Sequence, residues 1–499
     1  MKITYSDQKL NSIKGDFLTF AYDTKNTEIA ESFLTRFGGK ALRQQKKRQE
    51  FKNEPGKTLL VVSEKSPVQF CYTEVMDMSA DHLTNTARNW GAHARAQSER
   101  AHAQHVSVFV ESFFDTTVAQ AWMEGFLLAG YQYNQYKSKK QTPSVKRITL
   151  HISPEQKSLV QKGFTRAQHV VHGVTLTRDL VNTPAHDMTP SKLAETAHKI
   201  AALSKDHITA TVYSEVECAE MGMNSYLAVA KGSTEPPKFI HLVYKPTQET
   251  KKRVAIVGKG VTFDSGGLSI KPSQGMEDMK CDMAGAATVL GLFSTLVKLD
   301  IPVEVHGVIA ATENMPSGHA IRPGDIVTAS NGTTIEILNT DAEGRLTLAD
   351  ALVYIQKHEP DAVIDLATLT GACMVALGEE IAAMYANDDQ LAQDLKQSAH
   401  ATGEPLWRMP LHATYDKLIE SKVADIRNIS TVPYGGSITA AMFLQRFINK
   451  GQVWAHLDIA GPAFASKPLN AYTQYGASGY GVATLIHYLE TPTSAETAE

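Results

Sequence analysis

The chain has 499 residues and a formal net charge of −4, with 43% hydrophobic and 20% charged residues. These values are ordinary for a globular protein with a sizeable core, and the length suggests two large domains. The slightly acidic balance gives no general attraction to nucleic acid or an anionic membrane, and no run reaches the roughly 18 apolar residues of a membrane helix. The N-terminus lacks the apolar core of a signal peptide and no two cysteines form a C-x-x-C pair, so we expect a cytoplasmic protein with reduced thiols.

The first third of the chain alternates short apolar runs with amphipathic stretches, which is typical of an α/β domain. We expect this N-terminal domain to cover residues 1–160. Its predicted elements are strands at 59–63, 106–110 and 148–152 and a helix at 119–131. Two basic clusters, at 46–48 and 137–140, are most simply solvated faces, although contact with nucleic acid is the sharper alternative.

A helix is predicted next, because apolar residues recur at helical spacing over 166–181 until Asn-Thr-Pro at 182–184 ends the pattern. We expect a linking helix between two domains, over 161–183. Ser191 then has the position of an N-cap, with Glu195 in the first turn of a further helix.

Apolar runs separated by helical patterns mark the second part of the chain, over 184–490, ahead of a small, polar and acidic tail at 491–499. The predicted strands cover 254–257, 303–311, 362–366 and 453–459, and the predicted helices cover 284–299 and 346–356. Buried strands that alternate with helices favour a central mixed, mostly parallel sheet. The predicted fold class is therefore α/β, with an N-terminal α/β domain and a larger catalytic α/β domain.

Charged residues gather directly after the strand at 254–257, and such loops are where parallel sheets build functional sites. Lys259 leaves the strand, Asp264 precedes a Ser-Gly-Gly turn where backbone can approach another group, and Lys271 follows an apolar Leu-Ser-Ile. Asp282 comes just before a nearly all-apolar helix and could simply cap it. Structural explanations stay open as well, namely a surface salt bridge for Lys259 and an ordinary turn for the glycines.

The second charged stretch is N-T-D-A-E-G-R-L at 339–346, just before a predicted helix. Asp341, Glu343 and Arg345 lie two residues apart, so in an extended segment their side chains share one face and form a platform for a metal and an anion. The alternatives are an Asx-turn for Asp341 and a solvated helix start for Arg345.

The carboxylates of these two stretches cannot crowd together unless cations neutralise them. They belong to Asp264, Asp282, Asp341 and Glu343. Two divalent metals about 3.5–4 Å apart would neutralise them and could activate a water held between them. Ligation by oxygen suits Mn²⁺, Mg²⁺ or Zn²⁺ without separating them.

Both charged stretches resemble the catalytic segments of the leucyl aminopeptidase (cytosol aminopeptidase) family, peptidase family M17. The octapeptide at 339–346 is that family's signature without a mismatch, and V-G-K-G-V-T-F-D-S-G-G-L-S-I-K at 257–271 matches its other catalytic segment. Shorter matches extend the resemblance to residues 165–490 and lie at 180–184, 282–287, 367–371 and 457–461. The first third is similar only in size and in its α/β pattern.

The resemblance implies a role for each site residue. A tightly held metal would be bound by Lys259, Asp264, Asp282 and Glu343, and a more exchangeable one by Asp264, Asp341 and Glu343. Lys271 would stay charged and stabilise an oxyanion, while Arg345 would hold a bicarbonate ion that relays a proton. Lys259 must be neutral to bind a metal, which requires a pKa far below its ordinary value. The implied substrate-pocket residues are Met279, Asn339, Thr368, Leu369, Gly371 and Ala477.

The resemblance also implies a substrate and an assembly. In this family the exchangeable metal binds the free α-amine of a peptide, so we expect a leucine-preferring but broad aminopeptidase in intracellular peptide turnover. Two Mn²⁺ or Zn²⁺ ions per subunit and a homohexamer are expected with it. One departure concerns the pocket: the chain has G-A-S-G-Y-G at 476–481 where many relatives have G-x-[ST]-G-R-P.

Other hydrolase classes fit less well. Two-metal phosphatases and amidohydrolases lean on histidine ligands, which the candidate set lacks, and neither G-x-S-x-G nor H-E-x-x-H occurs. The alternative from another class is a DNA-binding regulatory protein with secondary peptidase activity, for which the basic clusters are the only support. Salt-sensitive binding to duplex DNA that survives loss of the metal ligands would distinguish it.

Overall fold

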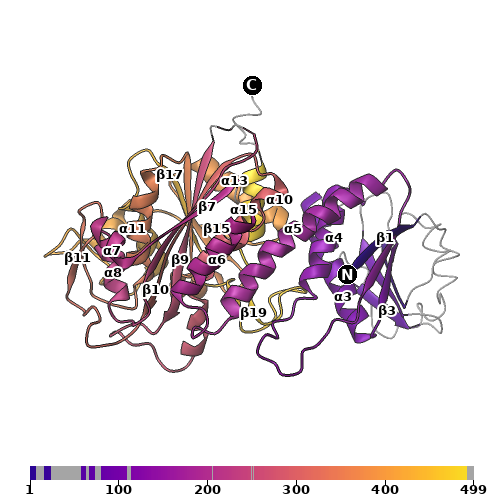
Figure 1. The fold of residues 1–499 in the computed structure, drawn as a ribbon, viewed down its shortest axis with the longest axis horizontal. Coiled ribbons are helices and arrows are strands. Elements are labelled where there is room, and N and C mark those ends of the chain that lie inside the picture. The colour runs from indigo at the N-terminus through magenta and orange to yellow at the C-terminus, as the bar shows by residue number, and fades with distance from the viewer. Residues whose placement is uncertain are drawn as a thin grey trace. The chain divides into compact units, whose positions relative to one another are not determined.

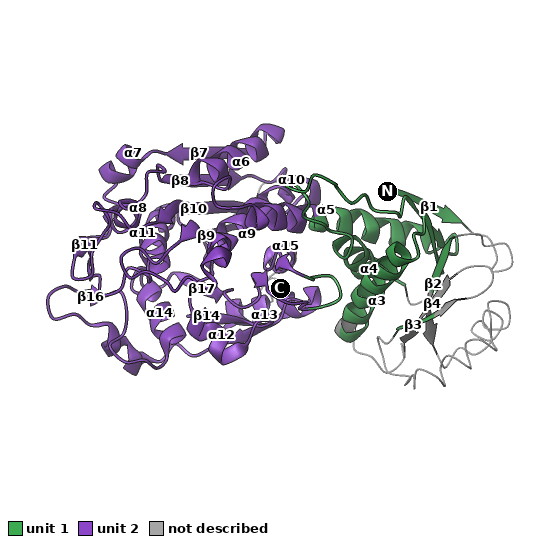
Figure 2. Ribbon diagram, turned by 90° about the horizontal axis from the view of Figure 1, so that it is seen from below, with its two compact units in different colours: residues 1–171, 470–474 green, residues 172–469, 475–499 purple. Residues whose placement is uncertain are grey.

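The computed structural model (Figure 1) describes residues 1–6, 16–23, 58–62, 67–73, 80–109, 114–204, 206–248, 250 and 252–491. The chain divides into two compact units, residues 1–171 with 470–474 and residues 172–469 with 475–499 (Figure 2). The basic cluster at 46–48 and the tail beyond residue 491 lie outside the described residues. None of the described helices combines the length and the apolar character that a membrane crossing needs.

The first unit contains a six-stranded sheet in the order β1-β6-β5-β2-β4-β3, in which all neighbours are parallel except β3 and β4. Its strands are β1 (Lys2–Ser6), β2 (Phe17–Asp23), β3 (Thr58–Val62), β4 (Pro67–Thr73), β5 (His105–Phe109) and β6 (Arg147–His151). Each of the three predicted strands therefore begins one residue earlier than expected. Helices α3 (Ala80–Arg100) and α4 (Thr116–Leu128) pack against each other. The predicted helix at 119–131 begins at residue 116 because the Asp115 side chain accepts from Val118 N and caps it.

Helix α5 (Lys157–Asn182) is longer than the predicted linking helix, and the division between the units falls within it. Helix α6 (Pro190–Leu203) is capped by Thr189, whose side chain accepts from Lys192 N, so the expectation that Ser191 is the cap is wrong. Pro190 suits the first position of a helix, where its missing N–H has no partner to lose.

The second unit is built on an eight-stranded sheet in the order β15-β14-β17-β13-β9-β10-β8-β7. The pairs β14/β15, β17/β13, β13/β9 and β9/β10 are parallel and the other three antiparallel, which confirms a mixed sheet with parallel pairs in the majority. The strands are β7 (Ile208–Tyr213), β8 (Lys238–Tyr244), β9 (Arg253–Asp264), β10 (Glu304–Asn314), β13 (Ala362–Ala367), β14 (Ala382–Ala386), β15 (Leu406–Arg408) and β17 (Val453–Asp458).

Helices lie on both sides of this sheet in Figure 1. The helices not yet given are α7 (Glu215–Glu220), α8 (Asn224–Ala230), the 3₁₀ helix η3 (Met276–Cys281), α9 (Ala284–Phe293), α10 (Leu296–Leu299), α11 (Gly344–Gln356), α12 (Gly371–Leu377), α13 (Asp389–Thr402), the 3₁₀ helix η4 (Ala413–Ile419), α14 (Gly436–Gln445) and α15 (Val482–Glu490). The short strands are β11 (Ile326–Thr328), β12 (Thr334–Glu336), β16 (Ile426–Arg427), β18 (Phe464–Ala465) and β19 (Gly476–Ala477).

Strand β9 is much longer than the four-residue strand predicted at 254–257, and Lys259 lies within it rather than beyond it. Gly258 and Gly260 interrupt the apolar run, which is why the pattern ended early. The strand continues through them because it packs closely there: a Cβ at Gly258 would lie 2.5 Å from the main-chain oxygen of Gly285.

The helix predicted over 284–299 is divided into α9 and α10. The hydroxyls of Ser294 and Thr295 donate to the main-chain oxygens of Gly291 and Leu292 at 2.7 Å, and such local bonds compete with the helical ladder.

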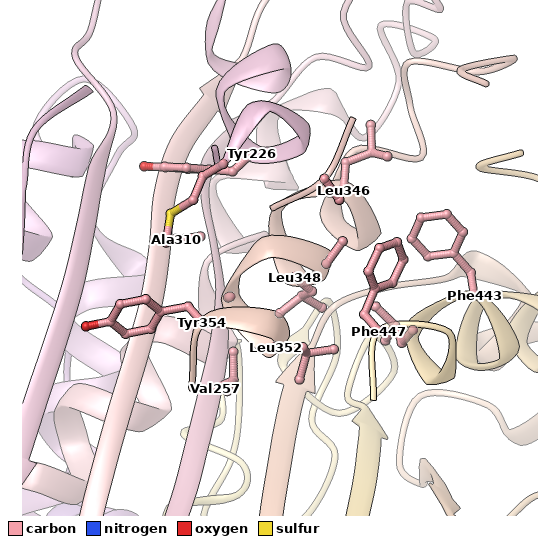
Figure 3. Close-up of a cluster of buried hydrophobic side chains, with 14 of the residues drawn as sticks. Tyr226, Val257, Ala310, Leu346, Leu348, Leu352, Tyr354, Phe443 and Phe447 are labelled. Atoms are coloured by element: carbon pink, nitrogen blue, oxygen red, sulfur yellow. The ribbon is translucent and has the colours of Figure 1, made fainter. Parts of the chain in front are cut away.

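One core cluster of the second unit packs α11 against the sheet (Figure 3). Its labelled members are Tyr226, Val257, Ala310, Leu346, Leu348, Leu352, Tyr354, Phe443 and Phe447. Leu346, Leu348 and Leu352 come from α11 and are at most 1% exposed. Because apolar packing fixes α11 on β9 and β10, the charged octapeptide at its N-terminus has a defined position beside the carboxyl ends of these strands.

Candidate metal centre

Lys259 is the most buried basic residue of the centre, with 2% of its surface exposed. Its Nζ donates to Asp282 Oδ1 at 2.6 Å and to the main-chain oxygen of Thr368 at 3.0 Å, and it lies 2.9 Å from Glu343 Oε1. The surface salt bridge considered for Lys259 is therefore excluded. Gly344 makes room for the side chain, because a Cβ there would lie 2.4 Å from Lys259 Cε.

Asp264 is the last residue of β9, and its carboxylate interacts both with the glycine turn and with Lys271. Gly266 N donates to Asp264 Oδ1 at 2.9 Å, and Lys271 Nζ lies 2.8 Å from Asp264 Oδ2 and 2.5 Å from Asp341 Oδ1. Gly266 has φ +86°, and a Cβ there would also lie 2.8 Å from Asp341 Oδ1. The turn thus brings its backbone against the second charged stretch, as its glycines predicted.

The octapeptide at 339–346 is a turn that leads into α11, so the prediction of an extended segment with one shared face is wrong. Asn339, not Asp341, makes the Asx-turn, since its Oδ1 accepts from Asp341 N at 2.8 Å. Glu343 already has helical backbone angles, φ −77° and ψ −34°. Arg345 is only 7% exposed and donates from Nη1 to the main-chain oxygen of Asn428 at 2.7 Å, so it is not a solvated helix start.

Asp282 does not cap the helix that follows it. Helix α9 begins after Met283, with no side-chain hydrogen bond at its cap. The Asp282 carboxylate, 5% exposed, instead accepts from Lys259 Nζ and from Thr368 Oγ1 at 2.8 Å. Four sequence segments therefore meet at one buried point.

Carboxylate oxygens of Asp264, Asp341 and Glu343 lie within 4.8 Å of one another, which is close enough to share a metal ion. The centre holds four carboxylates but only two ammonium groups. Burial raises the pKa of the Asp282, Glu343 and Asp341 carboxyls, because negative charge is costly there. Burial opposes the charge of Lys259 and Lys271 too, but the adjacent carboxylates outweigh burial and raise the pKa of both. The surplus negative charge is what a divalent cation would neutralise.

The comparisons with known proteins agree with this geometry. The family model described as "Cytosol aminopeptidase family, catalytic domain" matches residues 175–486. A probable cytosol aminopeptidase of Cyanothece sp. is 45% identical over 449 residues, which cover 88% of this chain and 89% of the relative. One from Aquifex aeolicus is 42% identical, with 88% of each chain covered.

The chain belongs to the cytosol aminopeptidase family. It is accordingly a metal-dependent aminopeptidase. A solved mutant of tomato leucine aminopeptidase is 36% identical, covers 98% of this chain and 96% of its own, and has a TM-score of 0.87. The bottromycin maturation enzyme BotP in complex with Mn is 33% identical, covers 95% of this chain and 99% of its own, and has a TM-score of 0.82. These findings do not favour the alternative of a DNA-binding regulatory protein.

Two of the expected pocket residues of this aminopeptidase contact residues of the metal centre through their side chains. Thr368 binds Asp282 directly, Asn339 holds the backbone of Asp341, and Met279 lies in η3, where its main-chain oxygen accepts from Asp282 N at 3.4 Å. The remaining three are Leu369, beside Thr368, Gly371, the first residue of α12, and Ala477, whose N–H donates to Asn182 Oδ1 at 3.0 Å.

Three buried residues beside the centre were not found from the sequence. Asn314 donates to Asp264 Oδ1. The main-chain oxygen of Asn428 accepts a hydrogen bond from Arg345 Nη1, and its Nδ2 donates to the main-chain oxygen of Asn339. Asp458 accepts from Leu369 N and Thr370 Oγ1. Asn314 and Asp458 end β10 and β17, so the rule that loops at the carboxyl ends of strands build sites could have found them. No pattern in the sequence marks Asn428.

Proposed function

We propose that the metal centre binds two divalent cations, Mn²⁺ or Zn²⁺. The observation that supports this most directly is the convergence of four carboxylates, three of them buried, whose charge exceeds that of the two lysines between them. One cation would be held by Lys259, Asp264, Asp282 and Glu343, and the other by Asp264, Asp341 and Glu343. Two cations bound in this way would polarise the scissile carbonyl and supply a nucleophilic water near neutral pH.

Lys259 would change its charge when the cations bind. The carboxylates that raise its pKa would then share their charge with the cations, while burial would continue to favour the neutral amine. The lone pair of Nζ would become available as a ligand, and the released proton would make metal binding weaker at low pH.

Lys271 would have the opposite role and remain charged. Its side chain is 20% exposed, and its ammonium group lies 2.8 Å from Asp264 Oδ2 and 2.5 Å from Asp341 Oδ1, whereas Asp282 pairs with Lys259. A charge fixed there would stabilise the oxyanion of the tetrahedral intermediate.

Arg345 would hold a bicarbonate ion, whose chemistry is to pass a proton toward the leaving amine. The guanidinium fits an anion, because its Nε is buried and has no hydrogen-bond partner among the described residues. Burial lowers the pKa of Arg345 to about 10, so it keeps its charge at neutral pH.

The substrates would be peptides with a free N-terminus, since a cation at Asp341 can bind an unblocked α-amine. Met279 and Ala477 would give the first side-chain pocket an apolar wall that prefers leucine without excluding other residues. Asn339, Thr368, Leu369 and Gly371 would complete the pocket. We further propose a homohexamer that turns over peptides in the cytoplasm.

The experiment that tests the function is hydrolysis of leucine p-nitroanilide with added Mn²⁺ or Zn²⁺, then with a chelator, beside the N-acetylated substrate. Release from the free-amine substrate alone, and only with metal, is the expected result. Equal release from the blocked substrate, or none with any divalent metal, would contradict the proposal. Binding of duplex DNA by such an inactive protein would restore the regulatory alternative.

A further inference from the structure

Asn314 touches both carboxylates that are proposed to bridge the cations. It is the last residue of β10 and only 2% exposed. Its amide nitrogen, Nδ2, donates to Asp264 Oδ1 at 2.8 Å and lies 3.5 Å from Glu343 Oε2. The same nitrogen donates to the main-chain oxygen of Thr340 at 3.0 Å. One amide group therefore joins the end of β9, the end of β10 and the turn before α11.

A bulge in β9 aims Asp264 at Asn314. Thr312 lies opposite Val261, but Asn314 lies opposite Asp264, so β9 contains one extra residue between these pairs. With that extra residue, Asp264 instead of Phe263 pairs with Asn314, and residues paired in this way point to the same face. Strand bulges are frequent beside active sites because they redirect side chains.

The turn after β9 is also built around Asn314. The N–H and the hydroxyl of Ser265 donate to the main-chain oxygen of Asn314 at 3.0 and 2.7 Å. A Cβ at Gly267 would lie 2.8 Å from Asn314 Oδ1, so a glycine leaves the room that the amide needs. Ser265 thus holds the main chain of Asn314, while the absence of a side chain at Gly267 leaves space for its amide.

We infer that Asn314 is a positioning residue that sets the affinity of the metal centre, an inference that rests on the proposed binding of two cations. Each of the two bridging carboxylates has one oxygen beside Asn314 and the other beside a lysine: Asp264 Oδ2 beside Lys271 and Glu343 Oε1 beside Lys259. A neutral donor orients both carboxylates without adding charge. A cation in its place would cancel the surplus negative charge that attracts the metals, and a carboxylate would repel Asp264.

The test is Mn²⁺ affinity, measured by titration calorimetry on chelator-treated protein, for the wild type and for Asn314→Leu, which has a similar size but no donor. Loss of such a partner of a metal ligand typically costs roughly 10- to 100-fold in affinity, and this weakening is expected. Asn314→Ala should lose less, because a water in the smaller side chain's place can donate to the same oxygens. Thr312→Val is the matched control: Thr312 is fully buried in the same strand, donates only to the main-chain oxygen of Glu313 among its described side-chain bonds, and should leave Mn²⁺ affinity unchanged.

Wild-type Mn²⁺ affinity in Asn314→Leu would overturn the inference while leaving the proposed function intact. If that variant does not fold, Asn314→Ala decides: a water replaces the fixed amide only in part, so the inference requires weaker Mn²⁺ binding there too, and wild-type affinity would overturn it. A wild type that binds no Mn²⁺ would instead contradict the proposed function. A positioning role also predicts that saturating Mn²⁺ restores most of the kcat of Asn314→Leu, whereas a group that acts on the reacting atoms could not be replaced in this way.

Discussion

The two ends of the central sheet both carry buried ionisable side chains, but they balance charge differently. Where β9 and β10 begin, one hydrogen-bonded chain forms the histidine cluster, with contacts of 2.6 to 2.9 Å. Its members, in order, are Tyr354, His241, His306, Glu304 and Arg253. Where the same strands end, the metal centre brings together more carboxylates than ammonium groups.

The pKa shifts of the ionisable side chains differ in the same way between the two ends. Burial lowers the pKa of His241 to about 3 and lowers that of His306, so both rings are neutral at pH 7. Burial works against the charge of Glu304, but its bonds to His306 and Arg253 outweigh burial and lower its pKa. In the metal centre burial raises the carboxyl pKa values instead. The members of the histidine cluster satisfy one another's hydrogen bonds, whereas the metal centre has a surplus of negative charge that a cation would neutralise.

The strongest way to break this comparison is to make the same substitution at both ends. Glu343→Gln removes a proposed bridging ligand, and we expect kcat/KM to fall by more than the roughly 100-fold that losing a ligand's hydrogen-bond partner costs. Glu304→Gln should lower stability and leave kcat/KM and Mn²⁺ binding unchanged. Equal losses of activity in the two variants would show that the ends do not differ in function.

A second pair of substitutions removes one basic residue at each end, Lys271 at the metal centre and Arg253 at the histidine cluster. Lys271→Ala should lower kcat by about 100- to 1,000-fold, the usual cost of removing one oxyanion donor, with Mn²⁺ affinity retained. Arg253→Ala breaks the ion pair with Glu304 at 2.6 Å and should leave kcat unchanged. Steady-state kinetics and thermal unfolding of both variants check this. A loss of kcat in Arg253→Ala, or none in Lys271→Ala, would contradict the assignment.

A substitution in the expected substrate pocket tests the same difference between the two ends, with a smaller expected effect on kcat/KM. Met279→Ala should reduce the preference for leucine over alanine substrates by about 10-fold, since one methylene group in an apolar pocket is worth roughly 1–3 kcal/mol. Val243→Ala, a half-buried residue of β8 near the histidine cluster, should leave that ratio of kcat/KM values unchanged. An unaltered ratio in Met279→Ala would remove Met279 from the pocket.

The two ends should also respond to acid in opposite directions in metal-free protein. His241 and His306 have lowered pKa values, so the unfolded chain binds their protons first, and stability is lost as the pH falls below 6.5 toward 3. Glu343 has a raised pKa, so its folded form binds the proton more tightly, and stability is gained as the pH falls toward its unfolded value of 4.5.

Urea unfolding at pH 7.5 and pH 5 checks this prediction, with effects on the order of 1 kcal/mol. Glu343→Gln should stabilise the metal-free protein at pH 7.5 and less so at pH 5. His241→Phe should lose less stability on acidification than the wild type does. The same pH dependence in both variants would contradict the contrast.

Sequence predicted those parts of the molecule in which local pattern and tertiary structure agree. The strands at 106–110 and 362–366 were correct to within a residue because their central residues are buried on both faces and mostly apolar. Strand β9 was cut short because Gly258, Lys259 and Gly260 look like a loop until the close approach of Gly285 is known. The α/β class followed from the alternation of elements, whereas the broken helix at Ser294 depended on two hydroxyl bonds.

The charged residues of the centre were named from the sequence, but their geometry was not. The spacing of Asp341, Glu343 and Arg345 suggested one extended face, and the segment is a turn that becomes a helix. Asn428 was invisible because its contacts join residues about 90 positions apart. The sequence could not separate Asp282 from a helix cap, because its partners Lys259 and Thr368 are distant in the chain.

The measurement that tests the central claim most directly is the number of Mn²⁺ ions bound per chain by chelator-treated protein. We predict two ions for the wild type, with a matching rise in unfolding temperature, and fewer than two for Glu343→Gln. Glu304→Gln should still bind two. Two ions bound by Glu343→Gln, or none by the wild type, would contradict the account in which surplus carboxylate charge makes this end of the sheet a metal centre.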